Sequence, residues 1–249
     1  MSELWEQAEF ASARFASQAE RYDRYRPRYP AGLFVTLLRE ADLTEGDQVV
    51  EIGAGTGLAT QPLVENGLRV HAVEPAGELA RLAEEKLRGK ATFVSGSFED
   101  CPIPPRARLV AAFNAWHWVE PVLGLDRAAQ LLEGGGWLAL VWTEVVAWGP
   151  EGFDERLADI FGAPWPKRWE DMAASLGPVV DDERFGELHT FHQFFARSLD
   201  AATFVEVSRT YGGQRSDQQY DALREVISDE FGGRVTKTED AVVHLAQCR

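Results

Sequence analysis

The chain has 249 residues, of which 45% are hydrophobic and 26% charged, so it can bury a substantial core and falls outside the disordered and fibrous classes. Its formal net charge of -15 argues against nucleic acid and anionic membranes as partners, because both require clustered lysines and arginines. The two cysteines, Cys101 and Cys248, lie far apart without CxxC spacing, which argues against a disulfide scaffold and a zinc site.

The start of the chain and its histidines add two expectations. The first residues lack the basic start and apolar run of a signal peptide, and no apolar stretch approaches the roughly 20 residues that span a bilayer. We therefore predict a cytoplasmic protein without membrane contacts. The five histidines are scattered, and His189 and His192 would point to opposite faces of a strand, so no metal site is predicted.

The N-terminal part is predicted to be helical. The pattern over residues 9–40 indicates helices that are interrupted by the proline-containing segment 26–30. Pro30 is suited to open the second helix, whose apolar residues share one face.

Strands and helices then alternate over the next hundred residues. Short apolar or β-branched runs predict five strands, at 48–52, 69–73, 91–94, 109–113 and 137–142. Amphipathic segments closed by glycines predict helices between them, at 56–66, 76–88 and 123–132. This alternation implies an α/β fold with a parallel sheet covered by helices on both faces.

The alternation stops after Thr143. Aromatic and aliphatic residues between prolines and glycines predict short helices at 150–180, inserted near the end of the sheet as a lid. A sixth strand, two helices and a last edge strand are predicted to complete the chain, at 190–195, 201–211, 216–231 and 241–247.

Closely spaced glycines follow the first predicted strand. Glu51 begins an E-x-G-x-G-x-G pattern that places a strand, a glycine turn and a helix start in succession. Glycine lets the backbone turn sharply and lets a ligand approach closely, and the helix start offers unpaired N–H groups. The dinucleotide fingerprint G-x-G-x-x-G would need glycine where Leu58 or Thr60 stands, which weakens a nicotinamide assignment. An ordinary glycine-rich turn is the remaining alternative.

An acidic residue ends the second predicted strand. Glu74 lies 21 residues after Gly53, at the position where a carboxylate can accept hydrogen bonds from two ribose hydroxyls. The alternative is a solvated acid at a strand end.

These motifs resemble those of class I S-adenosylmethionine-dependent methyltransferases, and the resemblance covers most of the chain. It implies a Rossmann-like fold with a mostly parallel seven-stranded sheet, a helical insertion after the fifth strand and S-adenosyl-L-methionine as cofactor. In that family the glycine loop passes beneath the methionine and ribose, which assigns Gly53, Ala54 and Gly55 to this contact. The resemblance further places Glu51 under the cofactor amino group, and Glu74 with Pro75 at the ribose.

Two residues after the third strand match the family's adenine-binding positions. By resemblance, Ser97 would bond the adenine amino group and the backbone N–H of Phe98 would bond the ring. Aspartate is commoner at the position of Ser97, which is a departure from the family pattern. The Phe98 side chain could equally belong to the core.

The segment Phe113-Asn114-Ala115-Trp116-His117-Trp118 follows the fourth strand, at the sheet edge where ligands bind in open α/β folds. It resembles the small-molecule branch of the family, of the trans-aconitate methyltransferase type, where an H-W pair occupies this place. The resemblance puts Asn114 near the sulfonium, and Trp116 and His117 beside the cofactor or acceptor. His117 is the candidate general base, with a structural histidine as the alternative.

The N-terminal pattern Y-x-x-x-R-P-x-Y-P resembles the same branch. It implies that Tyr22, Arg26 and Tyr29 fold over the methionine end of the cofactor, where arginine suits a carboxylate through its planar fork. A helix start held by tyrosine packing is the alternative.

The sequence thus predicts a methyltransferase that acts on a small molecule, as a monomer or homodimer, with O-, N- and carboxyl-methylation left open. A non-catalytic S-adenosylmethionine-binding protein and an NAD(P)-dependent oxidoreductase are the alternatives. We expect a single domain over residues 1–249, made of an N-terminal helical cap, a cofactor-binding core, a helical insertion or lid and the C-terminal part of the sheet, at 1–40, 41–145, 146–185 and 186–249.

Overall fold

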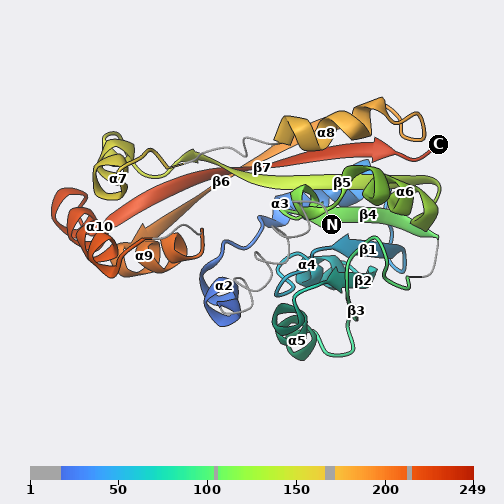
Figure 1. Ribbon diagram of the computed structural model, residues 1–249, viewed down its shortest axis with the longest axis horizontal. Helices are drawn as coiled ribbons and strands as arrows, with labels where there is room; N and C mark the ends of the chain where they lie inside the picture. Colours follow the sequence, from blue (N-terminus) through green and yellow to red (C-terminus); the bar gives the residue numbers. More distant parts are fainter. Residues whose placement is uncertain (1–17, 104–105, 166–171, 212–214) are drawn as a thin grey trace.

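The computed structural model describes residues 18–103, 106–165, 172–211 and 215–249, and the strands within these ranges form a seven-stranded sheet (Figure 1). The strand order is β3-β2-β1-β4-β5-β7-β6. Strands β1 to β5 run parallel, β7 is antiparallel to β5, and β6 is antiparallel to β7. The strand bounds are β1 Gln48–Ile52, β2 Arg69–Glu74, β3 Thr92–Ser95, β4 Ala107–Phe113, β5 Leu132–Ala147, β6 His189–Asp200 and β7 Arg234–Gln247. The predicted α/β class with a mostly parallel seven-stranded sheet is confirmed.

Helices cover both faces of this sheet, as the alternating pattern predicts. Helices α3 and α4 pack on one face and α6 and α8 on the other, each burying one apolar side. In the described ranges the helix bounds are α2 Ala19–Tyr25, α3 Ala31–Glu40, α4 Thr60–Glu65, α5 Gly77–Lys86, the 3₁₀ helix η1 Trp116–Trp118, α6 Pro121–Leu131, α7 Phe153–Phe161, α8 Met172–Asp181, α9 Ala201–Arg209 and α10 Asp217–Glu230.

The central strand β1 shows why this sheet places polar groups at one edge. Val49, Val50, Glu51 and Ile52 are all buried, because a central parallel strand is covered on both faces. Parallel neighbours β2 and β4 end beside it, with Ile52 level with Val73 and Ala112. The turns that follow these strands therefore gather at the carboxyl edge of the sheet, where ligands bind in open α/β folds.

The three strands β5, β7 and β6 extend well beyond the parallel part. β5 pairs with β7 as far as Ala147 with Thr238, and β6 pairs with β7 as far as Asp200 with Arg234. Helices α7, α9 and α10 cover this extension around buried side chains that include Phe153, Phe204 and Leu223. We call the described residues of 145–165 and 195–239 the arm lobe, and Figure 1 shows it at the left end of the molecule.

Several element boundaries differ from the sequence prediction. The strands expected at 190–195 and 241–247 are segments of longer strands, because charged residues in the arm lobe hide the apolar alternation there. The expected last edge strand is wrong: β7 lies between β5 and β6, and β6 forms the edge. Helix α4 begins at Thr60 rather than residue 56, because Gly55 and Gly57 have positive φ values that a helix excludes.

The predicted insertion after β5 is helical, but it is not one unit. Helix α7 packs in the arm lobe against α10, whereas α8 packs against α6 and η1. A single lid over residues 146–185 therefore does not describe the arrangement of these two helices.

The N-terminal segment contacts both the parallel part of the sheet and the arm lobe. Helix α2 contacts α5 of the parallel part and α9 of the arm lobe. Its Arg21 pairs with Glu206 at 3.0 Å, and its Asp23 pairs with Lys86. Helix α3 is part of the core rather than the predicted cap, since Leu33 is fully buried against the sheet. Residues 1–17 of that predicted cap lie outside the described residues.

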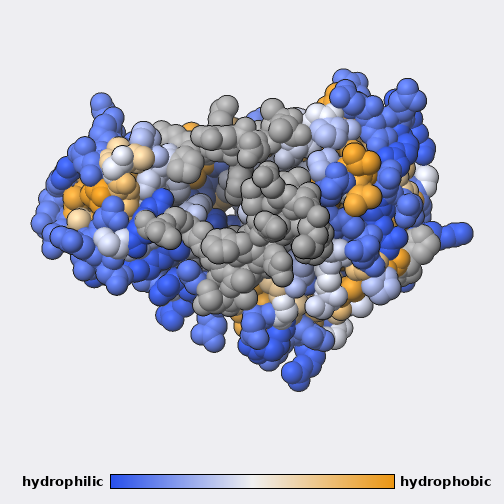
Figure 2. Space-filling view, viewed as in Figure 1, coloured by the Kyte–Doolittle hydropathy of each residue, from blue (hydrophilic) through white to orange (hydrophobic). Residues whose placement is uncertain are grey.

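The coloured part of the face in Figure 2 is largely hydrophilic, with apolar side chains in small groups. Of the helices in the described ranges, none combines the length and apolar character that a bilayer crossing requires.

Candidate functional site

The glycine loop after β1 has a backbone conformation that is unfavourable for residues with a side chain. Gly53, Gly55 and Gly57 have φ values of +64°, +57° and +80°, in the left-handed region that glycine adopts without a Cβ penalty. The N–H of Ala54 donates to the carbonyl of Val73 at 2.9 Å, which ties the loop to β2. The loop therefore passes close over the carboxyl ends of both strands.

Glu74 fastens this loop from the end of β2. Its Oε2 accepts a hydrogen bond from Gly55 N at 2.8 Å, and its Oε1 accepts one from Ala76 N at 2.8 Å. Burial raises the pKa of this carboxyl, whereas the two backbone N–H groups oppose that rise. Since a carboxylate has about four acceptor positions, two remain for a ligand. The structure thus brings together the glycine loop and the acid that the sequence paired by spacing.

Glu51 lies beneath the loop and is 1% exposed. Burial raises its pKa to about 8, and hydrogen bonding to Thr60 opposes the rise. Among the described residues, its Oε2 has no hydrogen-bond partner. A buried carboxyl with one open oxygen suits a cationic or hydrogen-bond-donating group placed above it.

The raised pKa of Glu51 predicts a pH-dependent stability of the ligand-free protein. In the unfolded chain the carboxyl ionises above about 4.5, but in the folded chain it stays protonated up to about 8. The stabilisation from this group is therefore complete below the lower value and is lost as pH rises toward the higher one. We expect the unfolding free energy of the wild type, relative to that of Glu51→Gln, to fall by about 2 kcal/mol between pH 5 and 7, because other titrating groups such as His117 contribute equally to both proteins.

Denaturant unfolding across this pH range measures the effect. Glu65→Gln, at an exposed position on α4, is the matched control and should keep the wild-type slope. Parallel curves for wild type and Glu51→Gln would show that the Glu51 carboxyl ionises equally in both states.

Asn114 organises the end of β4. It has a φ of +53°, and its Oδ1 accepts from Thr143 N at 2.8 Å. Its Nδ2 donates to Tyr29 Oη at 2.8 Å and to Thr143 Oγ1 at 3.3 Å. This side chain therefore joins β4, β5 and the N-terminal segment. Its predicted contact with a cofactor stays a prediction.

Thr143 is a site residue that the sequence reading missed. It lies within β5 directly after the apolar run 137–142, and its place as the first polar residue after that run was the available signal. Tyr29, its neighbour through Asn114, packs edge-on against Phe34 and Phe113, and burial raises the tyrosine pKa.

The residues of η1 divide between core and surface. Trp116 is 2% exposed and belongs to the core on the α6 side, where it lies over Gly124. His117 is partly buried, and desolvation lowers its pKa to about 4, so the imidazole is neutral at neutral pH. Its ring lies 4.8 Å from that of Trp118, which is partly exposed.

The residues predicted at the adenine and ribose ends follow β3 and β2. Ser97 is partly exposed, and its Oγ lies 3.5 Å from Asp100 Oδ2. The Phe98 side chain is buried in the core, which leaves its backbone N–H as the candidate adenine contact. Pro75 is exposed beside Glu74.

Arg26 turns toward the arm lobe. Its guanidinium lies over the ring of Tyr211 at 4.1 Å and of Tyr22 at 5.1 Å, and its Nη2 donates to Thr210 O at 3.1 Å. Its Nε has no hydrogen-bond partner among the described residues. The contact with Tyr211 was not expected, because the two residues are far apart in sequence.

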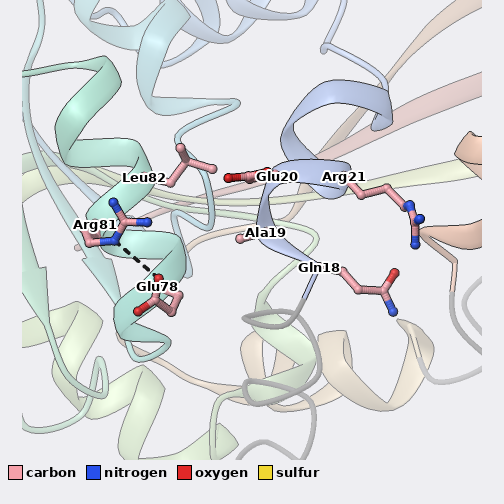
Figure 3. A pocket seen from close by; sticks show the side chains of 7 residues that line it. All are labelled: Gln18, Ala19, Glu20, Arg21, Glu78, Arg81 and Leu82. Carbon is pink, nitrogen blue, oxygen red and sulfur yellow. Dashed lines mark hydrogen bonds and ion pairs between the residues drawn. The ribbon is translucent and has the colours of Figure 1, made fainter.

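Two other features lie apart from these residues. A cavity of about 400 Å³ opens between α2 and α5, lined by side chains that include Arg21, Glu78 and Arg81, and none of the predicted site residues faces it (Figure 3). His192 bonds Asp240 at 2.6 Å on the β6–β7 pair. Over the described residues, no three histidine, cysteine, aspartate or glutamate side chains form a group that could hold a metal ion.

Solved structures with the same architecture include methyltransferases. A protein from Anaeromyxobacter dehalogenans, assigned as a type II methyltransferase, superposes with a TM-score of 0.65 at 23% identity, over 89% of this chain and 97% of that one. Phosphoethanolamine N-methyltransferase 2 of Haemonchus contortus, solved with S-adenosylhomocysteine, superposes with a TM-score of 0.52 at 16% identity, over 92% of this chain and 57% of that one. The fold is therefore the Rossmann-like fold of class I methyltransferases.

Sequence relatives identify the family. Residues 50–140 match the family described as a methyltransferase domain. An uncharacterized methyltransferase of Geobacillus kaustophilus is 33% identical over 204 residues, which are 78% of this chain and 93% of that protein. One from Mycobacterium tuberculosis is 36% identical over 132 residues, which are 53% of this chain and 52% of that protein, so the chain spans about half the length of its mycobacterial relatives. The chain belongs to this methyltransferase family.

Proposed function

We propose that this protein binds S-adenosyl-L-methionine at the carboxyl edge of the sheet and transfers its methyl group to a small-molecule acceptor. The observation that carries the proposal is the position of Glu74, whose carboxylate is fixed by Gly55 N–H and Ala76 N–H with acceptor capacity to spare. The open Oε2 of buried Glu51 supports it, because the cofactor carries a cationic amino group. Membership of the methyltransferase family agrees with this ligand.

The predicted residues then take distinct parts of the cofactor. Glu51 faces the amino group, and Glu74 takes the ribose hydroxyls. The glycine loop, the adenine contacts and the residues around the methionine and sulfonium complete the set, which is Gly53, Ala54, Gly55, Pro75, Ser97, Phe98, Asn114, Trp116, His117, Tyr22, Arg26 and Tyr29.

The chain contributes geometry and electrostatics to the reaction. The bound cofactor supplies an activated methyl group on its sulfonium. The fixed loop and Glu74 orient this group, and orientation of two reactants can supply several kcal/mol of barrier lowering. His117 borders the acceptor as a neutral imidazole, and its lowered pKa makes it a weak base. Acceptors that are already ionised suit such a site better than neutral alcohols.

The two alternatives remain distinguishable. A nicotinamide-dependent oxidoreductase is disfavoured by Leu58 and Thr60, where its fingerprint requires glycine. A non-catalytic S-adenosylmethionine-binding protein would use the same loop and differ only in turnover. The resemblance to the trans-aconitate type, a cytoplasmic location and a monomeric or homodimeric state stay predictions.

Calorimetric titration of the protein with S-adenosylhomocysteine and with NAD and NADP tests the proposal. We expect binding of S-adenosylhomocysteine and no heat from either nicotinamide nucleotide. Transfer of labelled methyl from S-adenosylmethionine to members of a panel of small acids, amines and alcohols then tests catalysis. Nicotinamide binding without S-adenosylhomocysteine binding would overturn the assignment, and cofactor binding without transfer across the panel would favour the non-catalytic protein.

A further inference from the structure

Four charged side chains meet where the arm lobe contacts the N-terminal segment. Arg197, Lys237 and Glu239 come from β6 and β7, and Arg26 follows α2. Lys237 Nζ donates to Glu239 Oε1 at 2.6 Å and to the hydroxyl of Tyr211. Arg197 Nη2 donates to Glu239 Oε2 at 2.7 Å. We call Arg26, Arg197, Lys237 and Glu239 the cationic cluster.

Among the described residues, the cluster holds more positive charge than the carboxylates that contact it can balance. Lys237 and Glu239 are both 0% exposed, and Glu239 is the only carboxylate that pairs with Lys237 or Arg197 within the described residues. Arg26, whose guanidinium lies 4.1 Å from the ring centre of Tyr211, adds a third cation beside this pair, so three cations stand against one anion in this part of the described structure. Burying a charge without a counter-charge costs free energy. The excess also contrasts with the rest of the protein, whose formal net charge is -15. An anionic ligand beside the cluster would balance this excess positive charge.

The cluster is continuous with the candidate cofactor site. Arg26 lies three residues before Tyr29, whose hydroxyl accepts a hydrogen bond from Asn114 Nδ2 at the end of β4. Along β7, Lys237 and Glu239 share a sheet face with Ala241, which pairs with Thr143 of β5. The positive charge therefore lies on the side of the sheet where Asn114 and Thr143 hold the candidate site together.

Aromatic rings border the cluster. Lys237 Nζ lies 4.5 Å from the ring centres of both Trp148 and Tyr211. These rings meet edge to face at 5.2 Å, and Trp148 also meets Trp165 in this way at 4.8 Å. An apolar wall next to a few charged groups is typical of small-molecule sites.

We propose that the cationic cluster binds the anionic group, a carboxylate or phosphate, of the methyl acceptor. This inference rests on the proposed function and adds the class of substrate. A single carboxylate, such as that of the cofactor, would balance only one of the two excess positive charges. The acceptor supplies the second anion, opposite Lys237 and Arg197.

The protonation of Lys237 supports this assignment. Burial lowers its pKa to about 7, Glu239 opposes the decrease, and Arg197 and Arg26 add to it. Besides Glu239, the titratable group in contact with the ammonium among the described residues is Tyr211, from the segment after α9. An anion beside Lys237 favours its charged form, so binding should take up a proton above neutral pH.

Calorimetry on the full chain saturated with S-adenosylhomocysteine tests the proposal. The probes are succinate, inorganic phosphate and the neutral isostere succinamide. We expect at least one of the two anions to bind and succinamide not to, with the heat of binding at pH 8 changing between buffers of different ionisation enthalpy. Lys237→Met should weaken anion binding about tenfold or more and remove the proton uptake. Arg234→Met, at an exposed position on the same strand, is the matched control.

Each outcome decides the proposal. Succinate binding assigns a carboxylate acceptor, and phosphate binding alone assigns a phosphorylated one. Binding of neither anion while S-adenosylhomocysteine still binds would overturn the anionic acceptor and leave the proposed function intact, and equal anion affinity in Lys237→Met would do the same. Absence of S-adenosylhomocysteine binding would remove both. If Lys237→Met does not fold by circular dichroism, Lys237→Gln takes its place.

Discussion

Glu74→Ala should lower the affinity for S-adenosylhomocysteine by about two to four orders of magnitude. Two hydrogen bonds from ribose hydroxyls to a carboxylate contribute about 1.5–3 kcal/mol each, and 1.4 kcal/mol corresponds to a factor of ten. The substitution also releases Gly55 N and Ala76 N, which the carboxylate holds at 2.8 Å. Calorimetric titration of the purified variant measures the loss.

Two further variants separate binding from folding. Glu74→Gln keeps an amide oxygen that can accept one of the backbone hydrogen bonds, so it should be more stable than Glu74→Ala yet still bind weakly. Glu78→Ala removes an exposed acid that pairs with Arg81 one turn into α5, and it should bind like wild type. If Glu74→Ala binds S-adenosylhomocysteine as tightly as the wild type, Glu74 does not contact the ribose, and the proposed function loses its main support.

The sequence predicts the parallel part of the sheet well, because short-range hydrophobic patterns and residue spacings determine its strands and turns. The strand before the glycine loop is apolar along its length because β1 is covered on both faces, and this burial is visible in the sequence. Glu74 could be paired with Gly53 because one βαβ unit fixes the distance between the ends of neighbouring parallel strands. The same local runs predicted seven strands, and the resemblance to class I methyltransferases agreed with that number.

Long-range contacts were beyond the sequence. Arg26 bonds a carbonyl 184 residues later, and Asn114 bonds Tyr29 85 residues earlier, so neither contact leaves a spacing pattern. Lys237 and Glu239 are charged and so lie outside the apolar run at 241–247 from which the last strand was predicted, whereas in the fold both are buried and pair with each other. Charged residues that pair in this way can be buried in a strand although they interrupt its apolar pattern. For this reason the hydrophobic pattern did not predict the arm lobe.

Gly53→Ala should destabilise the fold by about 2–5 kcal/mol, whereas Gly55→Ala should cost about 1–2 kcal/mol. Both glycines have positive φ, for which an L-residue pays about 1–2 kcal/mol. At Gly53 a new Cβ would also lie 2.5 Å from Ala115 Cβ, and relieving such overpacking costs about 1–3 kcal/mol. At Gly55 a new Cβ meets nothing within 4 Å. Denaturant unfolding of the two variants measures this difference.

The order should be reversed for binding. Relative to the stability that each variant loses, Gly55→Ala should weaken S-adenosylhomocysteine binding more than Gly53→Ala does. The space beside Gly55 is where the cofactor is proposed to pass, so a methyl group there competes with the ligand and should weaken S-adenosylhomocysteine binding about tenfold or more. Equal stability of the two variants would show that Ala115 and η1 yield readily around position 53. Unchanged binding in Gly55→Ala would mean that the ligand does not lie against the turn after β1, because a close backbone approach is the reason that this position requires glycine.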